Sequence, residues 1–95
     1  MCLSVEYDDE KNIKNIKKHG ISLQDAAYIF NDKHRIEYYD IKHSFTEDRY
    51  ITIGMVDMVL FVVYTERKDK IRLISARIAN KKEQEEYYDS YHYYY

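Results

Sequence analysis

The chain has 95 residues, of which 45% are hydrophobic and 34% are charged, and its formal net charge is −2. This length is enough for one modest hydrophobic core and too short for two, and the composition excludes an intrinsically disordered chain. A general nucleic-acid-binding domain would be strongly basic, so the total charge argues against that class. We therefore expect a single domain over residues 1–95.

The charged residues are unevenly distributed along the chain. Residues 1–10 contain four acidic residues and no Lys or Arg, whereas residues 63–82 contain seven Lys or Arg and two acidic residues. Residues 83–95 contain four acidic residues and no Lys or Arg. Exposed charges act over about 10 Å in physiological salt, so a local basic surface keeps its field in a nearly neutral protein.

Cysteine use and hydropathy indicate the cellular compartment. Cys2 is the only cysteine, so no intrachain disulfide can form and a reducing compartment is the simplest expectation. No apolar run approaches the roughly 18 residues of a membrane span, and the first ten residues are acidic where a signal peptide is basic. We expect a cytoplasmic protein that does not associate with a membrane.

The first third of the chain is predicted to form one strand followed by two helices. Alternation in "SVEYDD" predicts a short strand, and Asp8 or Asp9 then caps a helix that Gly20 ends. The apolar residues of this helix form a narrow stripe, Ile13 and Ile16, and its lysines fill the other face. Ser22 is placed to cap a second helix. The apolar side of that helix consists of Leu23, Ala26, Ala27 and Phe30.

After residue 32 the pattern changes to β-structure. The segments "HRIEYYD", "RYITIGM", "VLFVVYTE" and "KIRLISA" are rich in Ile, Val, Tyr and Thr, and the run at residues 59–63 is apolar on both faces, as in a central strand. We expect an α+β fold with an antiparallel four-stranded sheet plus a short N-terminal strand. Two N-terminal helices pack on one face of this sheet, and a helix follows at the C terminus.

The C-terminal segment opens with a helix start signal. Asn80 followed by Glu83 is a capping box, so a third helix begins there. Lys81 and Lys82 lie in its first turn, where the helix dipole disfavours a cation by about 0.5 kcal/mol, which is consistent with an anion bound nearby. Residues 87–95 contain six of the twelve tyrosines, so this end is either frayed or covered by a partner.

Two blocks of the sequence resemble the BrnT-like toxins. The first, "VEYDDEKNIKNIKKHGISLQDAAYIFND", has the family's strand ending in an aromatic-Asp pair, its Asn-x-x-Lys-His-Gly segment and its Ser-capped helix ending in Phe-x-Asp. The second, "EDRYITIGMVDMVLFVVYTERKDKIRLISARIANKKEQEEYY", has its Glu-x-Arg strand, its Val-rich strand ending in Thr-Glu-Arg and its Ile-Ser-x-Arg-x-Ala segment. The blocks occur in the family's order and cover about residues 5–88, which is nearly the whole chain.

The resemblance implies the toxin of a type II toxin–antitoxin pair, with a RelE-like fold and a metal-independent endoribonuclease activity that needs no cofactor. It also implies a set of partners. These are a small ribbon-helix-helix antitoxin, RNA as the substrate, operator DNA reached only through the antitoxin, and a second toxin molecule in a homodimer. Induction of such a toxin alone arrests growth.

Metal-independent RNA cleavage requires a base for the 2′-hydroxyl proton, cations around the pentacoordinate phosphate and an acid for the leaving 5′-oxygen. Arginine suits the second role because it stays charged. Arg77 and Arg49 match recurrent arginines of the family, and Arg67 is a third candidate catalytic residue. The candidate RNA-binding residues are Arg72, Lys81 and Lys82. For each arginine a surface ion pair is the structural alternative.

The relative orientation of two of these arginines depends on the regularity of the last strand. Arg72 and Arg77 are separated by an odd number of residues, so a regular strand points them to opposite faces. A bend or bulge near Ser75 would bring them to the same face. The sequence leaves both arrangements open.

The available groups for proton transfer are His19, Glu47, Glu66 and Tyr64, of which His19 and Glu47 are the candidate catalytic residues. His19 precedes Gly20, where a histidine also stabilises a helix C terminus, and Glu47 is equally suited to pair with an arginine. Tyr64 is expected in the core, and His43 is expected to be solvated in the long loop of residues 41–48.

Other chemistries have weaker support, and two hypotheses remain. Four histidines and one cysteine without His-x-x-x-His or Cys-x-x-Cys spacing predict no metal site, and two glycines cannot form a phosphate-binding loop.

The preferred hypothesis is an RNA-cleaving toxin. The alternative is a non-catalytic binding module that pairs with an antitoxin and acts in co-repression.

Overall fold

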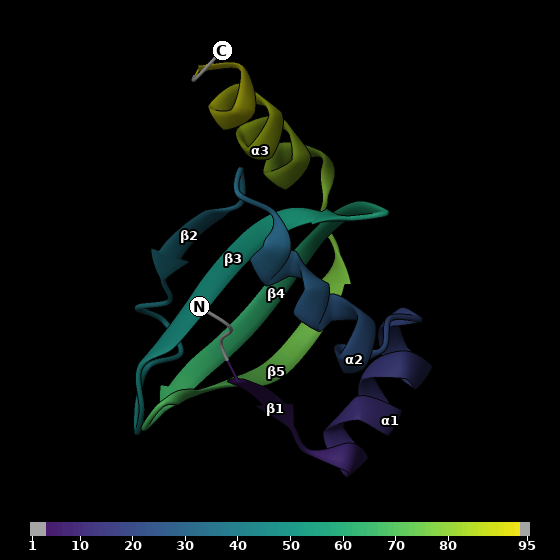
Figure 1. The fold of residues 1–95 in the computed structure, drawn as a ribbon, viewed down its shortest axis with the longest axis vertical. Coiled ribbons are helices and arrows are strands. Elements are labelled where there is room, and N and C mark those ends of the chain that lie inside the picture. The colour runs from purple at the N-terminus through teal and green to yellow at the C-terminus, as the bar shows by residue number, and fades with distance from the viewer. Residues whose placement is uncertain (1–3, 94–95) are drawn as a thin grey trace.

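The computed structural model describes residues 4–93, which form a sheet with helices across one face and a further helix at one end (Figure 1). The elements in chain order are β1 (Ser4–Tyr7), α1 (Asp9–His19), α2 (Leu23–Ala26), the 3-10 helix η1 (Ala27–Asn31), β2 (Ile36–Tyr39), β3 (Arg49–Val56), β4 (Met58–Arg67), β5 (Lys70–Ile78) and α3 (Lys81–Tyr93). None of the helices within these residues is long and apolar enough to cross a membrane.

The five strands form one mixed sheet in the order β1-β5-β4-β3-β2. Strands β2 to β5 pair in antiparallel fashion, and the apolar run at residues 59–63 lies in the central strand β4, as predicted. The N-terminal strand belongs to the same sheet, because β1 pairs in parallel with β5 from Ser4 opposite Lys70 to Tyr7 opposite Leu73. The fold is α+β as expected, but the four-stranded antiparallel sheet is corrected to a five-stranded mixed one.

Local sequence signals set the helix boundaries. The carboxylate of Asp8 accepts hydrogen bonds from two N–H groups in the first turn of α1, and Gly20 ends this helix with a φ of 74°. The hydroxyl of Ser22 caps α2. Asn80 and Glu83 form the predicted capping box, with both side-chain-to-backbone hydrogen bonds at 2.8 Å. These predictions are confirmed.

One face of the sheet is covered by α2 and η1 (Figure 1). The predicted second helix is α-helical only over Leu23–Ala26 and continues as the 3-10 helix η1. Its buried residues share one cluster with apolar side chains of the sheet, and the members with 0% exposure are Leu23, Ala26, Ile29, Val62 and Ala76. Gly54 permits this close approach, because a Cβ there would lie 2.7 Å from Cγ1 of Ile29.

Helix α1 lies beside strand β5 and does not bury its apolar stripe. Ile13 and Ile16 are 65% and 45% exposed, whereas Asn15 is buried. The Asn15 amide donates to the C=O of Ala76 at 2.8 Å and accepts from the N–H of Ala76 at 3.1 Å. It thus makes the two backbone hydrogen bonds that a neighbouring strand would otherwise make with β5. It also donates to the C=O of Ile21 at 2.7 Å. The apolar stripe of Ile13 and Ile16 is therefore not the side of α1 that faces the sheet, because the helix turns Asn15 toward the backbone of β5 instead.

Helix α3 covers one end of the opposite face of the sheet. Tyr87 is buried, and its hydroxyl donates to the carboxylate of Asp32 at 2.6 Å. Its apolar partners are Ile53, Val59 and Ala79. The tyrosine-rich end therefore begins within a docked helix, in which the next residue, Tyr88, is 43% exposed. The last two residues of that end lie outside the described residues.

Candidate active site

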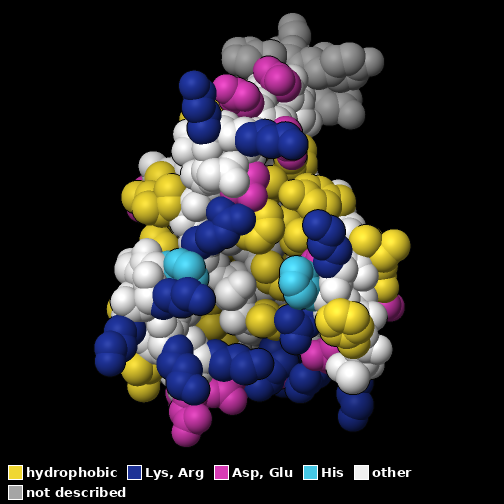
Figure 2. Space-filling model, turned by 180° about the vertical axis from the view of Figure 1, so that it is seen from behind, with side chains coloured by type: hydrophobic (Ala, Val, Ile, Leu, Met, Phe, Trp, Pro, Cys, Tyr) yellow, Lys and Arg dark blue, Asp and Glu magenta, His cyan; other side chains and the backbone are white. Residues whose placement is uncertain are grey.

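The face of the sheet opposite α2 and η1 is only partly covered by α3, and we call it the open face. Strand pairing and side-chain alternation place Ile51, Val63 and Ser75 side by side on it, with Phe61 next to them. We call these four residues the floor. Figure 2 looks onto this face and shows a hollow with hydrophobic side chains at its base. Lys and Arg side chains surround the hollow, and histidine side chains border it.

A β-bulge brings two arginines of β5 to the open face. The pairing of β5 with β4 skips Ile74, which lies between the partners of Val63 and Tyr64. One extra residue reverses the alternation that follows it, so Arg72 and Arg77 point to the same face. Of the two arrangements that the sequence left open, the structure has the one in which Arg72 and Arg77 lie on the same face.

Arg49 joins the same face through a row of residues across three strands. Arg49 lies opposite Thr65, and Thr65 lies opposite Arg72. Within residues 4–93, no acidic side chain forms an ion pair with Arg49. This row lies at the end of the sheet away from α3, so the floor has arginines at both of its ends.

Arg77 is held at the α3 end of the floor by two interactions. Its guanidinium donates to both carboxylate oxygens of Glu83 at 2.8 and 2.9 Å, and its Cζ lies 3.9 Å from the centroid of the Phe61 ring. The hydrogen bonds to Glu83 raise the pKa of Arg77 above its usual value. The side chain remains 35% exposed, so the group is oriented, charged and accessible.

Two other arginines are held by acidic side chains. Arg72 pairs with Glu6 of the neighbouring strand β1, and it lies 3.9 Å from Asp8. Arg67, at the end of β4, pairs with Glu47 at 3.4 Å and is 53% exposed. Arg67 and Glu47 thus form an ion pair with each other at the end of the sheet away from α3.

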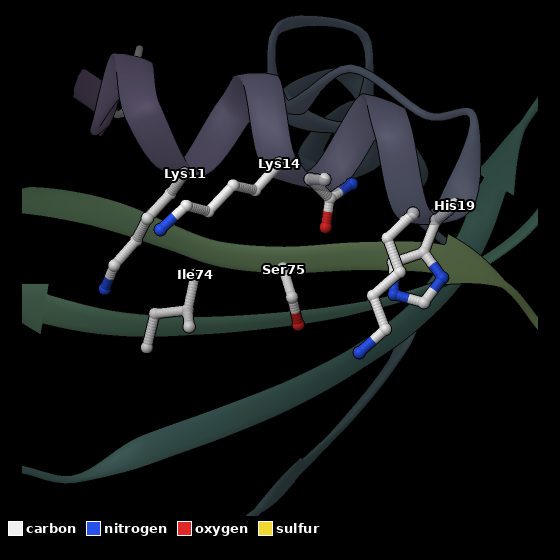
Figure 3. A pocket seen from close by; sticks show the side chains of 7 residues that line it. Lys11, Lys14, His19, Ile74 and Ser75 are labelled. Carbon is white, nitrogen blue, oxygen red and sulfur yellow. The ribbon is translucent and has the colours of Figure 1, made fainter.

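A basic cleft of about 260 Å³ lies between α1 and β5 (Figure 3). Lys11, Lys14, Lys18 and His19 of the helix line it, and Ser75 of the floor lines its other side. By sequence pattern alone, the lysines belong to a solvated helix face. Their spacing of three and four residues was the signal that could have identified them as one group. His19, a predicted site residue, therefore lies with these lysines beside the floor.

Other positions that the sequence singled out lie away from the floor. Lys81 and Lys82 are exposed in the first turn of α3. Tyr64 is buried on the helix-covered face, and its hydroxyl donates to Glu37. Burial, and then the hydrogen bond to Glu37, raises the pKa of Tyr64 far above its usual value.

Acidification is expected to release α3 from the sheet. Burial alone would raise the pKa values of Asp32 and Glu83, but hydrogen bonds from Tyr87 to Asp32, and from Arg77 and Asn80 to Glu83, hold them below their usual values of 3.8 and 4.5. A carboxyl group whose pKa is lower in the folded state than in the unfolded state stabilises the fold at pH values above its unfolded-state pKa. This stabilisation is lost as the pH falls through the pKa of the folded state.

The thermal midpoint should therefore fall steeply below about pH 4, as followed by circular dichroism. An Asp32→Asn variant should show a smaller fall, because one titrating group has been removed. Equal acid sensitivity of the two proteins would contradict a role for Asp32 in docking α3.

Comparisons with known proteins identify the family and support the fold. Residues 7–83 match the family described as ribonuclease toxin, BrnT, of type II toxin-antitoxin system. The fold is similar to the 1.1 Å crystal structure of the Brucella abortus ribonuclease toxin BrnT, with a TM-score of 0.65 and 20% identity over 84% of this chain and 100% of that chain. None of the curated proteins compared with the chain matches it. Because the family match spans most of the sequence, the resemblance is confirmed, and the chain belongs to the BrnT family of ribonuclease toxins of type II toxin–antitoxin systems.

Proposed function

We propose that the open face binds a single RNA strand and cleaves it without a metal ion. The observation that carries the proposal is the convergence of Arg49, Arg72 and Arg77 on one face of the sheet, beside the lysines of α1. Arginine and lysine bind phosphate through charge and hydrogen bonds. The apolar floor offers a surface on which unpaired bases stack.

The reaction consists of one displacement at phosphorus with two proton transfers. The bond between O2′ and phosphorus forms while the bond between phosphorus and O5′ breaks, which leaves a 2′,3′-cyclic phosphate and a 5′-hydroxyl end. A base accepts the 2′-hydroxyl proton, and an acid donates a proton to O5′. Positive charge close to phosphorus stabilises the pentacoordinate transition state.

The residues of the open face divide into roles by position. Arg77 and Arg49, at the two ends of the floor, stabilise the reacting phosphate, and Arg72 and the cleft lysines bind flanking phosphates. His19 exchanges a proton with the substrate from the cleft. Arg67 and Glu47 pair with each other, so we assign them to holding the loop of residues 41–48 against β4. Lys81 and Lys82 are left as peripheral RNA contacts.

The toxin is proposed to act in the cytoplasm together with an antitoxin. A type II system pairs a toxin with a protein antitoxin, and we infer a small antitoxin with a ribbon-helix-helix DNA-binding domain. In this arrangement the toxin reaches operator DNA only through the antitoxin, and two toxin molecules assemble into a homodimer. A size measurement of the co-expressed pair would test the stoichiometry.

A non-catalytic binding module is the second candidate, and one observation favours it. Three of the four candidate arginines are paired with acidic side chains, namely Arg67 with Glu47, Arg72 with Glu6 and Arg77 with Glu83. Such pairing reduces the positive field at the open face. A protein of this kind would bind the antitoxin and would leave RNA intact.

Incubation of the purified toxin with a single-stranded RNA separates the two candidates. We expect cleavage in the presence of a metal chelator, with 2′,3′-cyclic phosphate ends, and growth arrest when the toxin is induced without its antitoxin. Intact RNA together with unimpaired growth would support the binding module.

A further inference from the structure

A histidine–aspartate pair borders the open face on the side of β2. Asp40 directly follows β2 and continues its pairing with β3, because its N–H donates to the C=O of Arg49 at 2.8 Å. Alternation then places the Asp40 side chain on the same face as Tyr38 and Arg49. The Asp40 side chain is only 9% exposed, whereas that of His43 is 62% exposed. The carboxylate is therefore buried behind an accessible imidazole.

The pair has the geometry of an oriented base. Nδ1 of His43 lies 2.9 Å from Oδ2 and 3.1 Å from Oδ1 of Asp40. A carboxylate can only accept at neutral pH, so Nδ1 carries the proton, and in the neutral imidazole Nε2 is left as the acceptor. The loop is fixed on both sides of the imidazole, because the Ser44 hydroxyl donates to the C=O of Asp40 at 2.7 Å and accepts from the N–H of Arg49 at 2.9 Å.

The pKa of Tyr38 depends on the charges of both Asp40 and Arg77. The pKa of Tyr38 is raised by burial, then by the charges of Glu86 and Glu83, while Arg77 lowers it and Asp40 raises it. Asp40 and Arg77 therefore both contribute to the electrostatic environment of Tyr38. The strand register agrees, since Tyr38 lies opposite Ile51 of the floor.

We propose that His43 is the general base of RNA cleavage and that Asp40 is its positioning residue. The inference rests on the proposed ribonuclease function and adds to it the group that starts the reaction. Nε2 of His43 accepts the 2′-hydroxyl proton as O2′ bonds to phosphorus, and O5′ leaves with a proton from a separate donor. The negative charge of Asp40 stabilises the imidazolium that forms.

The charged and titratable surroundings of His43 bear on its pH dependence. They comprise Asp40 in direct contact, Arg49 on the facing strand, Tyr38 on β2, Lys42 beside it in the loop, Glu47 held by Arg67, and Asp48 held by the hydroxyl of Tyr39. Asp40 is the acidic side chain in contact with the ring. A contact between residues three apart also ties the loop together, so the experiment must distinguish a purely structural role from catalysis.

The test compares the wild-type toxin with His43→Gln and Asp40→Asn on two RNA substrates. The first is an ordinary single-stranded oligonucleotide, and the second carries a bridging sulfur in place of O5′, which leaves without protonation. We expect His43→Gln to lower the cleavage rate by about 10²–10³-fold on both substrates, because the base is needed for either leaving group. Asp40→Asn should cause a smaller loss at unchanged substrate affinity.

The pH profile supplies a readout that loop stability does not change. The wild-type rate should fall on the acid side, because a protonated imidazole cannot accept a proton, and His43→Gln should lack this limb. Lys42→Gln, which removes a charge from the same loop, should keep it. Thermal midpoints of all variants serve as the control for folding.

Each outcome decides between the proposals. A His43→Gln variant that cleaves both substrates at the wild-type rate, or that keeps the acid limb, overturns the role of His43 and leaves the ribonuclease proposal intact. A defect that disappears on the sulfur substrate would make His43 the acid and also overturn the proposal. A wild-type toxin that cleaves neither substrate overturns the proposed function together with this inference.

Discussion

Replacing Arg77 with alanine is expected to lower the rate of RNA cleavage by about 10²–10³-fold, as the loss of one preorganised group that stabilises transition-state charge does in other enzymes. The Phe61 ring positions the Arg77 guanidinium, whose Cζ lies 3.9 Å from the ring centroid, so a phosphate that displaces the Glu83 carboxylate meets an already oriented cation. The loss should appear mainly in kcat, since the charge on phosphorus grows in the transition state. Single-turnover cleavage of a labelled RNA would measure it.

Glu83→Gln provides the matched control for this prediction. It breaks the same ion pair but keeps the arginine, and glutamine can still take part in the capping box with Asn80. The Glu83 carboxylate occupies both guanidinium nitrogens that a phosphate would use, so its removal should leave cleavage intact and strengthen RNA binding. If both variants lose activity equally, the ion pair and not the arginine is what the activity requires.

The second large effect is expected on stability, from Asn15→Ala. This change leaves the N–H and C=O of Ala76 and the C=O of Ile21 without their side-chain partner in the interior. At about 1 kcal/mol for each hydrogen bond, the free energy of unfolding should fall by about 3 kcal/mol. For a domain of this size the thermal midpoint should fall by about 12–24 °C.

A control on the same helix separates this effect from helix propensity. Lys17→Ala lies two residues further along α1 at an exposed position, so its midpoint should stay close to that of the wild type. Asn15→Asp puts a buried carboxylate oxygen against the C=O groups of Ile21 and Ala76, to which the amide donates, so a loss at least as large as that of Asn15→Ala is expected. Chemical denaturation with a fluorescence readout would give the three values. A loss below about 0.5 kcal/mol for Asn15→Ala would show that α1 is not anchored through this amide.

The candidate site was predictable only in part. The arginines and His19 could be named from the sequence because charge and family motifs are visible there, and they remain predictions until cleavage is measured. The pairing of Arg72 with Glu6 could not be read from the sequence, because it depends on a parallel strand pair formed by residues 66 positions apart. The pair formed by Asp40 and His43 was also missed, because a loop histidine is exposed by default and its orientation follows from the burial of its neighbour.

By itself, the sequence determined the features whose energetics are local. The caps at Asp8, Ser22 and Asn80 and the end of α1 at Gly20 depend on hydrogen bonds and backbone angles within a few residues, so their side chains specify them directly. The α+β class followed in the same way from the change of hydrophobic period after residue 32.

Only the tertiary structure decided which residues share the open face. The bulge at Ile74 inverts the alternation of β5, and a bulge is set by how a strand fits its neighbours and not by its own residue types. The orientation of α1 was decided in the same way, because the unpaired backbone of β5 makes it more favourable to bury Asn15 than Ile13. Long-range backbone pairing thus turned arginines and lysines scattered along the chain into one surface.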